Sequence, residues 1–276
     1  MRRYEFPFSH DRMFMKVMEN EDVARIVAER CLGHRIGEIA RIEVQKTIPD
    51  APRYKSPRVD VYIEDVDGKR YNIEMQVNAE LALGKRMRYY QSEIDRGSVA
   101  AGGSYGTDLM ETFIVFICIK DPFGKGSARY LFERRCLEHP GIDLECGSHW
   151  MVLCADRWES AENPALSRLL EYVSTGEVPD GDGEIEMIDR SVGSLNARED
   201  VIDMFRNIDL RNYELIEQGK AEGKAEGEAL AYDLMETVSK ELTRLGRSDE
   251  IPAVLAKGRE GVEKAAEELG LAQPAR

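Results

Sequence analysis

The chain reads PRVDVYIEDVDGKRYNIEMQ from Pro57 to Gln76. Two runs in this stretch, residues 58–65 and 69–77, alternate apolar with polar side chains and are rich in β-branched and aromatic residues, which is typical of half-buried strands. An Asp-Gly pair separates the two runs, and this pair is a common turn sequence between antiparallel strands. We therefore predict a β-hairpin here.

The register of this hairpin decides which side chains meet. A two-residue turn would pair apolar with polar residues at every rung. A three-residue loop ending at Gly68, with that glycine in the left-handed region, shifts the pairing by one residue. It places Val61 opposite Ile73 and Asp60 opposite Glu74. Because a one-residue slip would move a whole apolar face into solvent, we predict the second register.

The predicted register makes an unusual pair of acids. Asp60 and Glu74 would face each other with Cβ atoms roughly 5 Å apart, which is normally destabilising. Gln76 lies two residues further along the same face. A divalent cation would remove the repulsion, and two carboxylates on rigid strands suit Mg²⁺. The hairpin alone leaves a second interpretation open, in which both acids lie hydrated on a solvent-exposed face.

Further elements surround the hairpin. We expect helices at residues 10–18, 21–32 and 79–101, and strands at residues 36–46, 112–119, 129–135 and 150–154. This order predicts an α/β sandwich. From about Ala161 the sequence becomes mainly helical, with a helix opened by Asn163-Pro164, a polar linker at 176–183, and helices at 197–207 and 213–245. We therefore expect a core at residues 1–160 and a helical C-terminal region at residues 161–276.

Composition narrows the class of protein. Of 276 residues, 42% are hydrophobic, which is enough to build a core. No run approaches about 18 apolar residues, so we expect no transmembrane helix. The first residues lack the apolar stretch of a secretory signal, and the five cysteines include no C-x-x-C pair, so we expect a cytoplasmic protein with reduced cysteines.

The charge is unevenly distributed along the chain. The net charge is -14, which by itself opposes binding to nucleic acid. However, residues 1–138 hold 23 Lys and Arg against 22 Asp and Glu, whereas residues 139–276 hold 15 against 30. The first part can therefore carry a local basic surface. We expect the acidic region after about Asp180 to regulate or assemble the protein and not to bind DNA.

A short repeat lies in that acidic region. Residues 218–229 read QGKAEGKAEGEA, with Gly219, Gly223 and Gly227 four residues apart. On a helix these glycines form one narrow stripe beside Glu and Lys side chains. The stripe is compatible with a solvated helix and with a close helix contact in a homo-oligomer.

Cations and aromatic residues recur on the helix expected after the hairpin. Lys85, Arg86, Arg88, Tyr89 and Tyr90 lie at helical spacing. Such a face can contact a DNA backbone and stack on bases, and we take Lys85, Arg88 and Tyr89 as candidate substrate-binding residues. The alternative is an ordinary amphipathic helix whose tyrosines pack on the sheet.

Two other groups could bind a metal. Asp11 and Glu19 lie near the first helix and could add an acid to the site, although a helix cap or a solvated acid explains them as well. A C-x₂-H spacing occurs at Cys136–His139 and again at Cys146–His149, and these residue types can bind zinc. The segment between the two pairs is shorter than in common zinc modules. Motifs of serine hydrolases, nucleotide kinases and dinucleotide-binding folds are absent from the sequence.

The hairpin also resembles a known family. Arg58-Val-Asp60 followed by Asn72-Ile-Glu74-Met-Gln76 resembles the core of the recombination-promoting nucleases, also called PD-(D/E)XK nuclease-family transposases. Similar segments occur at residues 11–16, 86–90, 113–123 and 222–227, so the resemblance covers roughly residues 4–230. It implies a restriction-endonuclease-like αβα core with a mixed central sheet, followed here by a C-terminal helical extension.

The resemblance also implies a function. It implies that the chain is a Mg²⁺- or Mn²⁺-dependent DNA endonuclease, a hydrolase of phosphodiester bonds that acts in recombination or transposition-like DNA breakage. Asp60 and Glu74 match the two acids of the motif and would bind the metal, and Gln76 falls where the motif has lysine. A glutamine donates hydrogen bonds but lacks the positive charge of a lysine, and Lys85 or Lys55 could supply that charge instead. The alternative is a catalytically degenerate nuclease fold that binds DNA or protein.

Overall fold

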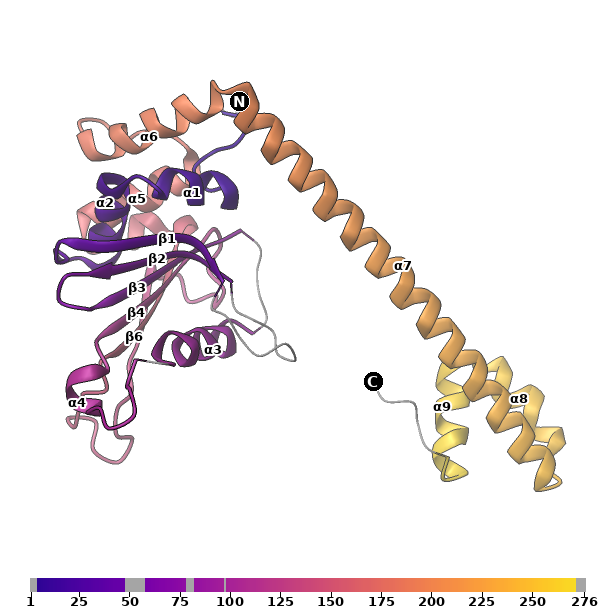
Figure 1. The fold of residues 1–276 in the computed structure, drawn as a ribbon. Coiled ribbons are helices and arrows are strands. Elements are labelled where there is room, and N and C mark those ends of the chain that lie inside the picture. The colour runs from indigo at the N-terminus through magenta and orange to yellow at the C-terminus, as the bar shows by residue number, and fades with distance from the viewer. Residues whose placement is uncertain (1–3, 48–57, 78–81, 97, 272–276) are drawn as a thin grey trace. The chain divides into compact units, whose positions relative to one another are not determined.

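The computed structural model describes residues 4–47, 58–77, 82–96 and 98–271. Contacts divide the chain into two compact units, Met1–Asp203 and Met204–Arg276. Helix α7 (Glu199–Arg244) begins in the first unit and continues into the second. The hairpin and all candidate site residues lie in the first unit, which is built around one sheet (Figure 1).

The sheet has six strands in the order β1-β2-β3-β4-β6-β5. The strands are β1 (Ile39–Thr47), β2 (Arg58–Asp65), β3 (Arg70–Gln76), β4 (Thr112–Cys118), β5 (Arg129–Phe132) and β6 (Ser148–Cys154). Strands β1, β2 and β3 are antiparallel, β3, β4 and β6 are parallel, and β5 pairs antiparallel with β6. Every residue of β4 is buried, as its continuous apolar sequence predicts. The sheet is therefore mixed, as expected.

Helices cover both faces of the sheet. Helix α1 (Asp11–Met18) contacts β1, β2 and β3, whereas α3 (Leu83–Asp95) contacts β4 from the opposite face (Figure 1). Helix α2 (Glu21–Leu32) ends at Gly33 in the left-handed conformation, as predicted. The predicted α/β architecture with a mixed central sheet is confirmed. Helix α3 ends at Asp95, before the predicted end at residue 101, and residues 79–81 of the predicted range lie outside the described residues. A four-residue helical turn, α4 (Tyr105–Asp108), follows it.

The hairpin has the predicted register. Val61 pairs with Ile73 and Ile63 pairs with Tyr71. Gly68 has φ 79°, and its N–H donates to the carbonyl of Asp65 at 2.9 Å. The three-residue loop therefore forms as the apolar pattern requires.

The helical part after residue 160 differs from the prediction. After a 3₁₀ turn (Ala155–Ser160), α5 (Pro164–Thr175) begins where Asn163 accepts two backbone N–H groups. Helix α6 (Gly183–Asn196) was missed, and α7 is one helix where two were expected. The sequence of α6 contains many acids and an interior glycine, Gly193, so its apolar stripe is difficult to recognise. In the structure Ile185, Ile188 and Val192 of this stripe are buried. Both α5 and α6 belong to the first compact unit, and the division predicted at residues 160 and 161 stays a prediction.

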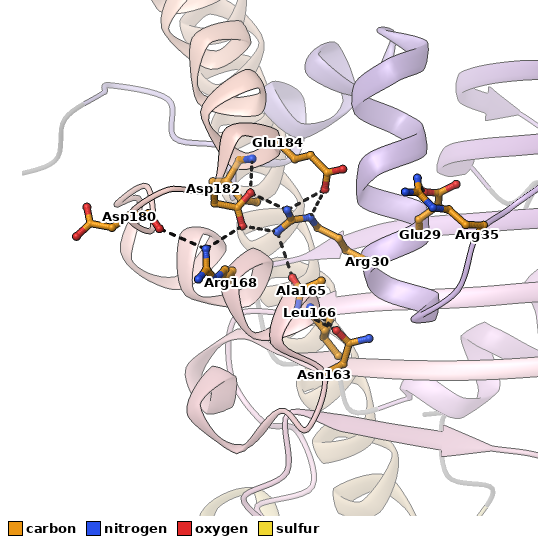
Figure 2. Close-up of polar contacts among 11 residues, drawn as sticks. Glu29, Arg30, Arg35, Asn163, Ala165, Leu166, Arg168, Asp180, Asp182 and Glu184 are labelled. Atoms are coloured by element: carbon orange, nitrogen blue, oxygen red, sulfur yellow. Dashed lines mark hydrogen bonds and ion pairs between the residues drawn. The ribbon is translucent and has the colours of Figure 1, made fainter.

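A buried ion pair joins α2 to the start of α6. Arg30 is 8% exposed and donates to both carboxylate oxygens of Asp182, at 2.9 and 2.6 Å (Figure 2). It also donates twice to Glu184, at 3.0 and 2.8 Å. Burial opposes ionisation of Asp182, but the bonds from Arg30 and from the N–H of Ile185 hold its pKa below the ordinary value. Two acids of the region that the charge distribution predicts to be a regulatory tail therefore pair with a buried arginine of the first unit.

The second unit consists of helices. The C-terminal part of α7 packs with α8 (Ile251–Ala256) and α9 (Gly258–Glu268) through Val238, Leu242 and Val262, with a 3₁₀ turn at Ser248–Glu250 between α7 and α8. A Cβ atom added at any glycine of the stripe in α7 would meet no atom within 4 Å among the described residues. The helix contact in a homo-oligomer therefore stays a prediction. None of the helices in the described ranges is long and apolar enough to cross a membrane.

Candidate functional site

The two acids of the hairpin lie across from each other on β2 and β3. The backbone N–H of Asp60 donates to Oε1 of Glu74 at 2.9 Å, and the N–H of Met75 donates to Oδ2 of Asp60 at 3.1 Å. Each carboxylate is thus bonded to the backbone of the opposite strand. Because these bonds hold both side chains to the strands, the two carboxylates have fixed positions at this rung.

The face that carries the acids is buried by α3. Glu74 is 0% exposed, Asp60 is half-buried, and Tyr62 on the same face is buried. Met87 and Tyr90 of α3 pack against this face together with Phe116, Ile114 and Val152. The alternative of two hydrated acids on a solvent-exposed face does not describe Glu74. A carboxylate in this position needs partners, because burial of an unpaired charge is costly.

Arg86 of α3 is the principal partner. Its Nη2 donates to Oε2 of Glu74 at 2.8 Å and its Nη1 donates to Oε1 of Gln76 at 2.8 Å. Its Nε donates to the hydroxyl of Tyr90 at 2.9 Å, and its guanidinium lies 5.1 Å from the ring centroids of Tyr90 and Phe116. One cation therefore joins the second acid, the glutamine and the helix that covers them.

Sequence reasoning did not place Arg86 in the site. It grouped this arginine with the other cations of the helix as part of a DNA-binding face. The available signal was the spacing of Arg86 and Tyr90 on one side of a helix, which directs both toward the sheet. What the sequence could not give was the rotation of α3 on the sheet, and that rotation decides which cation reaches the acids.

Glu74 has a strongly perturbed pKa. Burial and, next to it, the negative charge of Asp60 raise the pKa of Glu74 to about 8, although the charge of Arg86 and the hydrogen bond from the backbone N–H of Asp60 lower it. The ionised pair therefore carries more negative charge than its neighbours compensate. Perturbed carboxylates of this kind are common at functional sites.

The donor set fits a small divalent cation. Asp60 and Glu74 offer hard carboxylate oxygens on one rigid hairpin, and Mg²⁺ is commonly held by one or two carboxylates together with waters and substrate phosphates. A cation between them would offset the repulsion that raises the pKa of Glu74. These two residues could therefore hold Mg²⁺ or Mn²⁺.

The remaining candidates lie elsewhere. Lys85 and Arg88 are exposed on α3, and Tyr89 is partly buried against the core beneath that helix. Lys55 lies outside the described residues. Asp11 accepts the N–H of Arg12, and Glu19 pairs with Lys16, which are ordinary roles of acids at a helix end.

The four zinc candidates are not gathered around one point. Within the described ranges, no group of three or more His, Cys, Asp or Glu residues is arranged to hold a metal ion. Cys146 accepts from Arg134, and Cys136 contacts Glu138. The ring of His149 stacks on Phe113 with centroids 4.7 Å apart. The C-x₂-H spacing therefore does not form a site here.

A cavity of about 490 Å³ lies beyond the ends of β3 and β4. Val77 and Ile119, which follow these two strands, line it together with Tyr4, Ser9 and the end of α5. Val77 directly follows Gln76 in the sequence, but Asp60, Glu74 and Gln76 are not among the lining residues in the described part of the chain. Crevices at the carboxyl ends of parallel strands are common binding sites in α/β proteins.

Comparison with known proteins finds one family model that matches the chain. Residues 7–139 match the model of the PD-(D/E)XK nuclease family transposase. This part of the chain is similar to that family. The matched range, which is a little under half of the chain, contains the nuclease-family hairpin, α3 and Arg86. Searches of curated proteins and of solved structures find no match. The family supports a nuclease or transposase-like function and confirms the resemblance over the matched residues.

Proposed function

We propose that the chain is a metal-dependent endodeoxyribonuclease that hydrolyses phosphodiester bonds in DNA. The observation that supports this most directly is the pair of opposed carboxylates, Asp60 and Glu74, on the hairpin of a PD-(D/E)XK domain. Their fixed positions and the raised pKa of Glu74 favour a cation-binding role over a purely structural one.

Asp60, Glu74 and Gln76 would have different roles in this reaction. Asp60 and Glu74 would hold Mg²⁺ or Mn²⁺ through their carboxylate oxygens. When bound, such a cation lowers the pKa of a coordinated water and stabilises negative charge on the phosphodiester. Gln76, two residues beyond Glu74, orients the attacking water by donating a hydrogen bond from its amide.

DNA would approach along the exposed side of α3. Lys85 and Arg88 lie exposed on this helix, and cations in such positions contact backbone phosphates. Tyr89 would add an aromatic contact. We further propose that the protein acts in recombination or transposition-like DNA breakage. It would be located in the cytoplasm and self-associate through its C-terminal helices.

A nicking assay tests the proposal. Supercoiled plasmid is incubated with the full chain in Mg²⁺, in Mn²⁺ and in chelator, and the conversion to open circles is followed. We expect cleavage only with metal, and Asp60→Asn should lower its rate by about two orders of magnitude or more. The matched control is Asp67→Asn, which changes an exposed aspartate in the turn of the same hairpin and should cleave as the wild type does.

The alternative is a degenerate nuclease fold that binds DNA or protein without cleaving DNA. The uncharged Gln76 at the lysine position is the observation that favours it. A wild-type protein that binds DNA in Ca²⁺ but nicks none in Mg²⁺ or Mn²⁺ would support this alternative and contradict the endonuclease.

A further inference from the structure

We infer that Arg86 is the positioning residue that allows a glutamine to stand at the lysine position of this site. It holds the carboxamide of Gln76 in one orientation and supplies the positive charge that the glutamine lacks. The inference rests on the proposed nuclease function and adds to it a residue from a different element, helix α3.

The first step concerns the orientation of the amide. A guanidinium can only donate hydrogen bonds, so the atom of Gln76 that faces Arg86 must be its oxygen. The Nη1 to Oε1 distance is 2.8 Å. Oxygen and nitrogen share one planar group, and the amide N–H₂ is therefore directed away from Arg86. Gln76 presents donors at the position where a lysine would present its ammonium.

The second step concerns charge. The other amino group of the guanidinium lies 2.8 Å from Oε2 of Glu74, so the positive charge is next to the second acid of the motif. The side chain keeps 26% of its surface exposed, which leaves part of the cation within reach of a substrate. A planar guanidinium suits the oxygens of a phosphate.

The third step concerns rigidity. Arg86 donates to the hydroxyl of Tyr90 and lies over the rings of Tyr90 and Phe116. Its planar group is thus held by α3 and β4 independently of the two residues that it orients. Precise placement of a functional group depends on such support from rigid elements.

A purely structural counter-ion predicts a different behaviour. Arg86 competes with a metal for Glu74, because both are cations at the same carboxylate. Its removal should therefore strengthen metal binding while it weakens cleavage. Loss of a structural ion pair would instead lower the thermal stability, the metal affinity and the activity together.

The experiment compares Arg86→Met with Arg25→Met in the full chain. Arg25 is the matched control, because it lies on α2, outside the site, its side chain is 27% exposed, and it donates to the carbonyl of Gly37. Nicking rates are measured in Mn²⁺, and Mn²⁺ affinity is measured by calorimetry at about pH 9, where protons compete least. For Arg86→Met we expect cleavage about 100-fold slower and Mn²⁺ binding severalfold tighter, whereas Arg25→Met should change neither.

A second pair of variants tests the charge itself. Adding Gln76→Lys to the Arg86→Met protein restores the lysine of the motif and should recover at least about tenfold of the lost rate. Arg86→Lys should retain more activity than Arg86→Met. Circular dichroism melting confirms that each variant is folded.

Three results would overturn the inference. Arg86→Met could cleave within about threefold of the wild type, it could lose metal affinity and activity together, or the double variant could stay as slow as Arg86→Met. If the wild type itself cleaves no DNA, the proposed function fails and this inference fails with it. If the wild type cleaves and Arg86→Met cleaves equally well, only the inference fails.

Discussion

Glu74 should make the metal-free protein less stable as the pH rises. Burial and the charge of Asp60 raise the pKa of Glu74 in the folded state to about 8. In the unfolded chain a glutamate titrates near about 4.3. Between these two values the folded protein holds a proton that the unfolded chain has released. Because unfolding then releases a proton, the free energy of unfolding falls as the pH rises through this window.

The size of the effect follows from the two pKa values. One unit of pKa difference corresponds to about 1.4 kcal/mol. Between about pH 5.5 and about pH 8.5 the loss therefore approaches about 3 kcal/mol as an upper limit. An effect even half as large is easily measured by urea unfolding.

The assay uses urea unfolding in chelator at both pH values for the wild type and Glu74→Gln. The variant cannot ionise at this position, so its loss of stability with rising pH should be smaller by up to about 3 kcal/mol. Glu64→Gln, on the same hairpin, is the control and should follow the wild type. Equal pH dependence in the wild type and Glu74→Gln would refute the reasoning, because it would mean that Glu74 ionises as readily in the folded protein as in the unfolded chain.

Metal should reverse this trend. A cation binds the ionised pair, so Mg²⁺ or Mn²⁺ should raise the melting temperature more at about pH 8.5 than at about pH 5.5. Asp60→Asn should abolish most of that gain at both pH values. An equal response of the wild type and Asp60→Asn to metal would place the bound cation elsewhere.

Three further predictions concern the fold of the first unit. Asp182→Asn leaves a buried arginine with half its ion pairing and should cost about 3 kcal/mol or more in urea unfolding, whereas Asp180→Asn, at an exposed aspartate, should cost less than about 0.5 kcal/mol. Gly68→Ala requires a left-handed alanine beside Met110 and should cost about 1–2 kcal/mol by the same measurement. Truncation after Gly176 removes α6 and should lower the melting temperature sharply, while truncation after residue 211 should leave metal-dependent nicking intact.

The truncation prediction differs from what the sequence alone suggests. Composition places the start of an acidic regulatory tail near Asp180, because the acids there outnumber the cations. The structure uses Asp182 and Glu184 to pair the buried Arg30. Net charge describes a region, but it does not show which charges are paired inside the fold. A boundary drawn from charge therefore fell within a packed unit.

The hairpin shows what the sequence does predict well. Alternation of apolar and polar residues, together with the single left-handed position at Gly68, was enough to fix the pairing of Val61 with Ile73. That pairing in turn placed Asp60 across from Glu74. A strand pattern has a period of two, so a wrong register would expose the apolar face. The sequence pattern was sufficient here because the other register would move the apolar side chains of the hairpin into solvent.

The packing of α3 on the hairpin could not be predicted from the sequence pattern. Several cations on α3 share similar spacing, and only the packing of Met87 and Tyr90 on the sheet selects Arg86 as the one that reaches Glu74. The burial of Glu74 has the same origin, since the polar pattern of β3 would suit a solvent-exposed face. A long-range contact between a helix and a sheet therefore buries Glu74 on a face whose sequence pattern suits solvent.

The acids and the positive charge of the site come from different elements, and this explains how Gln76 can replace the lysine of the motif. The strands fix the positions of Asp60 and Glu74 through backbone bonds, so the acids have little freedom to move. The positive charge is under no such constraint, because any side chain that α3 directs at the same point can supply it. A lysine two residues beyond Glu74 and an arginine on the covering helix are equivalent solutions to one electrostatic requirement. The prediction that a lysine at position 76 compensates for loss of Arg86 tests this equivalence directly.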